Sequence, residues 1–262
     1  MAVYDVFPFL NELDLLEVRM EILDPYVDYF VIGECNKTFQ GNEKPFYFLE
    51  NRERYKKFEH KIIHNKFIDD KGDAWTNWDR DVNHKNVIAE ALKDCKDDDI
   101  ILISDLDEIP NLEGVPLDSF YKPGQLFHMM QEMYYYFIDL HQEGSERNWF
   151  GTKVCSYSYF KKTNIDTIRN AKSEGTQIPN GGWHFTFLGG AEKVIQKIES
   201  WGHKEFNNEH IKSKVAENIS NGTDLFFRPN SNLVQVPIDE SYPKYLRENL
   251  DRYPHFVRGV YV

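Results

Sequence analysis

Three carboxylates occur within four positions, at Asp105, Asp107 and Glu108, directly after the apolar run 100–104. If that run is a buried strand, side chains alternate along it, so Asp105 and Asp107 are predicted to share one side and Leu106 to take the other. Two carboxylates held this close repel each other unless a positive charge lies between them. Oxygen atoms are the ligands that Mg²⁺ and Mn²⁺ prefer. The spacing therefore predicts that Asp105 and Asp107 bind Mn²⁺ or Mg²⁺.

A metal at this position suits one kind of chemistry. Ligands of open α/β sheets bind beyond the carboxyl ends of the strands. A divalent cation there would contact the diphosphate of a nucleotide-sugar and neutralise charge as the diphosphate departs. The pattern is typical of a metal-dependent glycosyltransferase, with Asp107 serving catalysis through the metal. The alternative is a solvated acidic turn in which Asp107 or Glu108 caps the next helix, and the triplet alone leaves both readings open because short motifs also match by chance.

The segments around this cluster predict an α/β fold with a mixed, mostly parallel sheet flanked by helices. Short apolar runs predict strands at 4–9, 28–33, 60–68 and 100–104. Helical spacing of apolar residues predicts a helix that starts at an Asn11 cap and ends before Pro25. A second helix is predicted over 75–92, with Trp78 on its buried side.

Longer strands are predicted after residue 110, at 125–138 and 149–160, and a short one lies between the glycine pairs of GGWHFTFLGG, 181–190. Helices are predicted over 191–201, 208–220 and 242–250. Without repeats or linkers, the pattern predicts a single domain, residues 1–262. We expect about 1–110 to bind a nucleotide-sugar and about 111–262 to face an acceptor.

Composition limits the partners and the compartment. The chain has 31 basic and 43 acidic residues, a formal net charge of −12, which is unfavourable for binding nucleic acid. No apolar stretch approaches the roughly 20 residues of a membrane span, and the N-terminus does not read as a signal peptide. Three widely separated cysteines suit reduced thiols, so we expect a cytoplasmic protein.

Four segments together resemble glycosyltransferase family 17, over residues 4 to about 210. They are SDLDEIP, WTNWDRDVNHKNVIAEAL, GGWHFTFLGG and YDVFPFLNELDLLEVRMEILDPYVDYFVIGECNKTFQGNEKP. The resemblance implies a GT-A fold, which is Rossmann-like, and a divalent metal. It also implies a UDP-sugar donor, expected to be UDP-N-acetylglucosamine, a glycan acceptor, and transfer with inversion. Because the chain lacks the membrane anchor of the animal members, we expect a soluble, bacterial or viral type of member.

Candidate donor-binding residues lie near the predicted strand ends. Glu34 ends the second strand, where a carboxylate could bind the ribose hydroxyls or form a salt bridge at the sheet rim. Arg80 and Asn83 lie on the helix before the metal strand, and Arg80 could bind a diphosphate with two hydrogen bonds or be solvated. Together with Asp105 and His184, these residues form the predicted nucleotide-sugar site.

His184 is the predicted third metal ligand. A neutral imidazole is a common ligand, and the flanking glycines suggest a close backbone approach to a ligand. The alternative is a core histidine packed beside Trp183, and His203 is the rival for the same role.

Inverting transfer needs a general base that takes the proton of the acceptor hydroxyl. Glu192, at the start of a predicted helix, is the first candidate for this catalytic role. Glu174 and Glu146 are alternatives, and any of the three could instead be an ordinary surface acid.

Two other functions remain open from the sequence. A phosphohydrolase of the haloacid dehalogenase type also places two aspartates after a strand with Mg²⁺, although usually on its first strand. A glycan-binding module without catalysis could use the same acids to hold Ca²⁺.

Overall fold

The computed structural model describes residues 1–122, 124–172 and 174–259. Half of its large sheet is parallel. Strand β1 (Val3–Pro8) lies between β2 (Tyr29–Cys35) and β4 (Ile100–Ile103), and β3 (Ile62–Phe67) extends the sheet beyond β2. These four strands run in the same direction, so their carboxyl ends meet at one edge. This is the edge at which ligands of such sheets bind.

The other half is mainly antiparallel. Strand β8 (Asn148–Ser156) pairs with β4 on one side and with β6 (Leu126–Tyr135) on the other. Beyond β6 the sheet continues through β7 (Leu140–Gln142) to β11 (Leu233–Gln235). Strands β9 (Thr176–Ile178) and β10 (Gly182–Thr186) run parallel to β6, and β10 also pairs with the short β5 (Glu108–Pro110). The β5–β10 pairing places His184 opposite Glu108, the last carboxylate of the acidic cluster.

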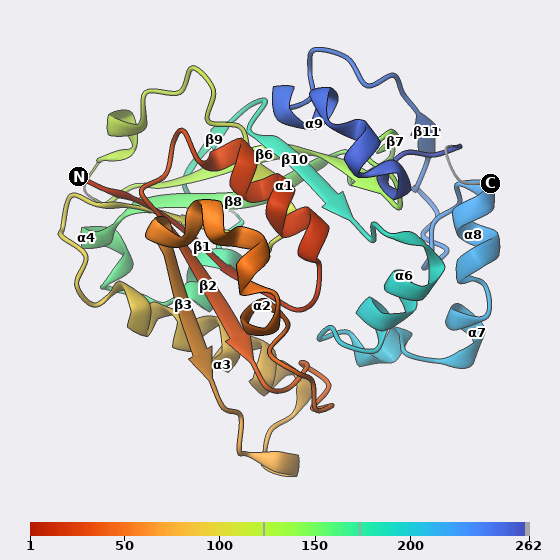
Figure 1. Ribbon diagram of the computed structural model, residues 1–262, viewed down its shortest axis with the longest axis horizontal. Coiled ribbons are helices and arrows are strands. Elements are labelled where there is room, and N and C mark those ends of the chain that lie inside the picture. The colour runs from red at the N-terminus through yellow and green to blue at the C-terminus, as the bar shows by residue number, and fades with distance from the viewer. Residues whose placement is uncertain (123, 173, 260–262) are drawn as a thin grey trace.

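Helices cover both faces of the parallel strands (Figure 1). Alternate residues of these strands face α1 (Leu13–Leu23) in one apolar cluster, and the residues between them face α3 (Asn77–Ile88) and α5 (Ile165–Asn170) in another. Helix α3 begins with a capping box between Thr76 and Asp79. The remaining helices are α2 (Tyr47–Glu50), α4 (Tyr157–Phe160), α6 (Gly190–Ile198), α7 (Glu209–Lys212), α8 (Val215–Asn221) and α9 (Lys244–Glu248).

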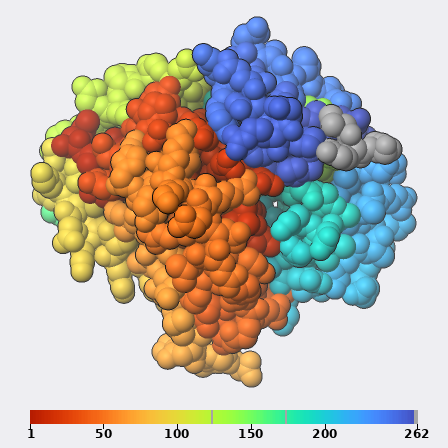
Figure 2. Space-filling view, viewed as in Figure 1, coloured from red at the N-terminus to blue at the C-terminus, as the bar shows by residue number. Residues whose placement is uncertain are grey.

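The two predicted halves of the chain share apolar contacts. Helix α9, from the C-terminal part, packs against α1, and Figure 2 shows these blue and red segments adjacent on the surface. Tyr242, Leu246 and Phe256 belong to the same core cluster as Leu15 and Phe30. A shared core is what a single domain requires, and the assignment of 1–262 as one domain stays a prediction.

The predicted fold class is confirmed, as a mixed α/β arrangement that is consistent with a Rossmann-like GT-A type. Several local predictions are wrong. Helix α1 has Glu12, not Asn11, at its N-cap position, and no side chain caps it. The helix predicted over 208–220 is two short helices, α7 and α8. Trp78 is 47% exposed, because α3 buries Arg80, His84 and Ile88 instead.

Candidate active site

The acidic cluster lies on a tight turn rather than on a strand. Strand β4 ends at Ile103, and β5 does not begin until Glu108. The prediction that strand alternation aligns Asp105 with Asp107 is therefore wrong. Both carboxylates nevertheless line the same pocket.

Arg19 holds this turn from inside the protein. Its side chain is fully buried and forms a two-point ion pair with Asp5, at 2.8 and 2.6 Å. Its Nη1 donates hydrogen bonds to the backbone carbonyls of Asp105, Leu106 and Glu108, at 3.1, 2.9 and 2.9 Å. Hydrogen bonds from a charged donor are stronger than neutral ones. Arg19 thus fixes the backbone on which the acidic side chains stand.

Glu108 supports the turn from the other side. It is 1% exposed and accepts the backbone N–H of Asp105 at 3.1 Å and the indole N–H of Trp149 at 2.6 Å. Arg169 donates to both of its oxygens, at 2.5 and 2.9 Å. Glu108 therefore organises the turn and does not cap a helix.

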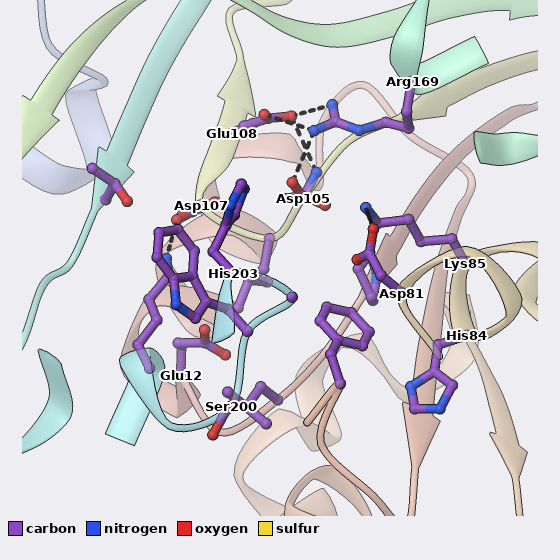
Figure 3. A pocket seen from close by; sticks show the side chains of 18 of the residues that line it. Glu12, Asp81, His84, Lys85, Asp105, Asp107, Glu108, Arg169, Ser200 and His203 are labelled. Atoms are coloured by element: carbon purple, nitrogen blue, oxygen red, sulfur yellow. Dashed lines mark hydrogen bonds and ion pairs between the residues drawn. The ribbon is translucent and has the colours of Figure 1, made fainter. Parts of the chain in front are cut away.

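Each aspartate of the turn has its own cationic partner. Arg169 donates to Asp105 at 2.8 Å, and Lys197 of α6 donates to Asp107 at 2.6 Å. Figure 3 shows Asp105 and Glu108 joined to Arg169 on one side of the pocket, with Asp107 apart from them. The two aspartates thus have different cationic partners, and these partners offset the repulsion between their negative charges.

These partners keep both aspartates ionised. Burial would raise the pKa of Asp107, but Lys197 and His184 outweigh it, and the pKa lies well below its usual range. Loss of hydration would likewise raise the pKa of Asp105. The positive charges of Arg169 and, to a smaller extent, Lys85 outweigh this effect and lower the pKa below its ordinary value. At neutral pH the turn presents two negative carboxylates.

The pocket has a volume of about 570 Å³ and draws its wall from both halves of the chain. Its charge differs from that of the whole protein. Seven Lys and Arg residues line it against six Asp and Glu residues, although the chain carries a net charge of −12. The cations are Lys37, Lys44, Lys85, Arg169, Lys172, Lys197 and Arg228, and the acids are Glu12, Asp81, Asp105, Asp107, Glu108 and Glu146. A negatively charged ligand therefore meets about as many cations as acids on this wall, whereas acids predominate in the chain as a whole.

His184 lies where the sequence placed it, beside the acidic turn. Its Nε2 is 3.6 Å from Asp107 Oδ1, and the residue is 8% exposed. Its Nδ1 is buried and has no hydrogen-bond partner among the described residues. The rival His203 also lines the pocket, but its ring nitrogen pairs with Glu205 at 2.7 Å. The geometry thus favours His184 as the partner of Asp107.

Glu34 is not on the pocket wall. Its side chain is fully buried, accepts the backbone N–H of Phe48 at 2.8 Å, and pairs with His64 at 3.0 Å. Lys44 lies 3.8 Å away. These contacts link the end of β2 to α2 and β3, which is the salt-bridge alternative rather than ribose binding.

Arg80 and Asn83 are also absent from the wall. Arg80 is 5% exposed, and it donates to Asp69 at 2.8 Å and to the carbonyls of Trp75 and Gly72. Asn83 donates to the carbonyl of Asp79, one turn earlier on α3. Both residues stabilise α3 and the loop before it, so neither is free for a diphosphate.

The three candidate bases lie in different places. Glu192 is exposed on the first turn of α6, outside the pocket, because α6 buries Val194 and Ile198. Glu174 is likewise exposed and outside it. Glu146 lines the pocket and pairs with Arg228. Of the three, only Glu146 can reach a ligand bound there.

The residues near Asp107 fit a divalent cation. Within the part of the chain that the structure describes, no three His, Cys, Asp or Glu side chains are grouped closely enough to hold a metal ion alone. Mg²⁺ and Mn²⁺ usually take only one or two protein carboxylates, and water and substrate phosphates fill the other positions. An ionised carboxylate that faces a buried imidazole nitrogen is a suitable donor set for Mn²⁺.

Sequence reasoning missed the cations of this site. Arg169, Lys197 and Lys85 come from α5, α6 and α3, and no local motif marks them. Lys85 pairs with Asp81 at 3.0 Å, one helical turn away, which is the one pairing that sequence spacing could have revealed. Lys197 is 90 positions from its partner Asp107.

Among the described residues, no helix combines the length and the apolar character that crossing a membrane demands.

The α/β fold, with its acidic turn beside a charged pocket, is consistent with the glycosyltransferase class that the sequence predicts. The chain belongs to glycosyltransferase family 17, whose family model matches residues 1–259. The resemblance seen in the four sequence segments is thereby confirmed.

Two similar proteins are the β-1,4-mannosyl-glycoprotein 4-β-N-acetylglucosaminyltransferases of Rattus norvegicus and Homo sapiens. Each is 25% identical to this chain over an alignment 296 residues long. The alignment covers 96% of this chain in both cases, 53% of the rat protein and 54% of the human protein. The chain therefore spans about half the length of the curated relatives that it matches.

Proposed function

We propose that the protein transfers N-acetylglucosamine from a UDP-sugar to a glycan acceptor, with a divalent metal and with inversion at the sugar carbon. The observation that carries the proposal is the ionised Asp107 facing His184 in a pocket rich in cations. Membership of family 17 supports sugar transfer, and the names of the similar proteins support N-acetylglucosamine as the sugar.

Asp107 and His184 would hold Mn²⁺ or Mg²⁺, with Asp105 beside them. When bound, such a metal supplies positive charge that stabilises the departing diphosphate. Arg19 and Glu108 keep the turn rigid, so the carboxylates need no rearrangement to bind a cation. Preorganised charge of this kind is usually the largest contribution to catalysis.

The donor is proposed to bind at the carboxyl ends of β1, β2 and β4. Pro8 ends β1, Cys35 ends β2 and Asp105 follows β4, and all three line the pocket. Gly33 of β2 lets α3 pack closely on the sheet, because a Cβ at that position would lie 2.3 Å from the buried Ile88.

Glu146 is proposed as the general base in place of Glu192. A base must come within hydrogen-bond reach of the acceptor hydroxyl, directly or through one water, and Glu192 lies outside the pocket. The Arg228 partner of Glu146 orients its carboxylate. Glu146 would take the hydroxyl proton as the acceptor oxygen attacks the sugar carbon.

In the test, the protein is incubated with UDP-N-acetylglucosamine, Mn²⁺ and a mannose-containing glycan. UDP release and the glycan product are measured. Transfer that stops in Asp107→Asn supports the proposal, and Lys193→Met, exposed on α6, is the control. Phosphate release from p-nitrophenyl phosphate without UDP release would instead favour the phosphohydrolase. Glycan binding without any transfer would favour the non-catalytic module.

A further inference from the structure

Lys197 forms an ion pair with Asp107, the carboxylate that is proposed to bind a metal. Its Nζ donates to Asp107 Oδ2 at 2.6 Å, and it also lies 5.0 Å from the ring centre of Phe187. The other oxygen of Asp107 faces His184. The carboxylate that is proposed to bind a divalent cation is therefore already neutralised by a side chain of the protein.

The cations at the turn differ in how firmly they are held. Arg169 is held by both Asp105 and Glu108, and Arg19 is fixed by Asp5 and three carbonyls. Within the described residues, Lys197 Nζ makes a single hydrogen bond, and its side chain is 23% exposed. A lysine ammonium is a point charge on a flexible four-carbon stem, so it can move from one anionic partner to another.

We propose that Lys197 is an internal counter-ion that neutralises Asp107 in the free protein and moves to the donor diphosphate when metal and nucleotide-sugar bind together. This inference rests on the proposed function. A divalent cation bound to Asp107 repels the ammonium that lies 2.6 Å from Asp107 Oδ2, so metal binding releases Lys197. The released ammonium then lines the pocket beside the diphosphate and needs an anionic partner, which the diphosphate provides.

The exchange couples the two ligands thermodynamically. Metal binding alone has to displace Lys197 and leaves its ammonium unpaired, so the metal binds weakly to the free protein. Nucleoside diphosphate restores a partner for that ammonium, so each ligand strengthens the other. Such coupling is reciprocal and commonly amounts to about 5- to 150-fold in affinity. The metal site at Asp107 would then be mostly empty in the cell until the nucleotide-sugar binds.

The test is titration of Mn²⁺ into the protein, followed by the electron paramagnetic resonance signal of free Mn²⁺, with and without UDP. We expect Lys197→Met to bind Mn²⁺ about 5-fold or more tightly than the parent without UDP, and to lose most of the gain that UDP gives. Lys197→Arg keeps the charge and should retain weak metal binding. Lys193→Met, on the same helix but outside the pocket wall, should match the parent.

The outcomes separate this inference from the proposed function. Equal or weaker Mn²⁺ binding by Lys197→Met would overturn the counter-ion role and leave the metal site standing. Absence of Mn²⁺ binding by every protein, even with UDP, would overturn the metal site and the counter-ion role together. Circular dichroism shows whether each variant is folded. If Lys197→Met does not fold, Lys197→Gln takes its place and the same outcomes apply to it.

Discussion

Arg19 on α1 and Asp5 on β1 form a fully buried ion pair, and the same guanidinium binds the backbone of the acidic turn through three carbonyls. The core of the fold and the geometry of the site therefore depend on one side chain. Neither residue lines the pocket, so the pair acts on the site by positioning the turn.

Replacing Arg19 should be costly for stability. Arg19→Met leaves Asp5 buried without its partner and three carbonyls without their donor, and breaking a buried pair typically costs about 3–5 kcal/mol. Urea unfolding followed by circular dichroism measures the loss. The double variant Asp5→Asn with Arg19→Met should recover part of it, and a single variant as stable as the parent would contradict the positioning role.

His84 should make stability dependent on pH. Burial lowers its pKa to about 4, despite Asp69 nearby, from an unfolded value near 6.5. The unfolded chain takes up a proton near pH 6.5 and the folded protein does not, so stability is greatest above that pH and falls as the pH drops toward 4. The loss should reach about 3 kcal/mol.

The measurement is the free energy of unfolding at pH 7, 6, 5 and 4 for the parent and for His84→Gln. The variant should lack this part of the acid loss, so its curve should be flatter than that of the parent. Parallel curves would show that His84 does not bring about the effect.

Glu146→Gln should lower the rate of transfer about 10²–10⁴-fold, because removing a general base has effects of this size. Its fold should survive, since the glutamine amide oxygen can still accept from Arg228. Glu192→Gln is the matched control and should keep the parental rate. A slow Glu192→Gln variant with a parental rate for Glu146→Gln would show that Glu192, and not Glu146, is the general base.

Glu34→Gln should affect stability rather than donor binding. The glutamine oxygen can replace one acceptor, but it cannot match the ionised carboxylate beside Lys44 and His64. Losing a hydrogen bond to a charged group costs about 1.5–3 kcal/mol. Thermal melting should show the loss, while the KM for the nucleotide-sugar stays unchanged, and a raised KM at parental stability would restore the ribose assignment.

Sequence reasoning succeeded where a signal was local. The apolar runs that became β1, β2 and β4 were recognisable, and so was the acidic cluster at the end of β4. His184, which the sequence grouped with the acidic cluster, lies beside Asp107, and its role as a metal ligand stays a prediction. These features depend on residues a few positions apart.

The predictions that were not supported involve distant contacts. The turn at 105–108 departs from strand geometry because Arg19, about 86 positions away, binds its carbonyls. Arg80 looked available for a phosphate, yet Asp69 and the loop carbonyls occupy its donors. Lys197 lies on a helix whose orientation is set by Val194 and Ile198 in the core. No pattern in one sequence shows which of its lysines will meet an aspartate 90 residues away.

The central claim, that Asp107 holds a metal which receives the diphosphate, is tested most directly by calorimetry of UDP binding with and without Mn²⁺. For the parent protein we predict heat of binding that requires Mn²⁺, and for Asp107→Asn, folded by circular dichroism, no such heat. UDP binding of equal strength in both proteins, or in the parent without any divalent cation, would contradict the claim.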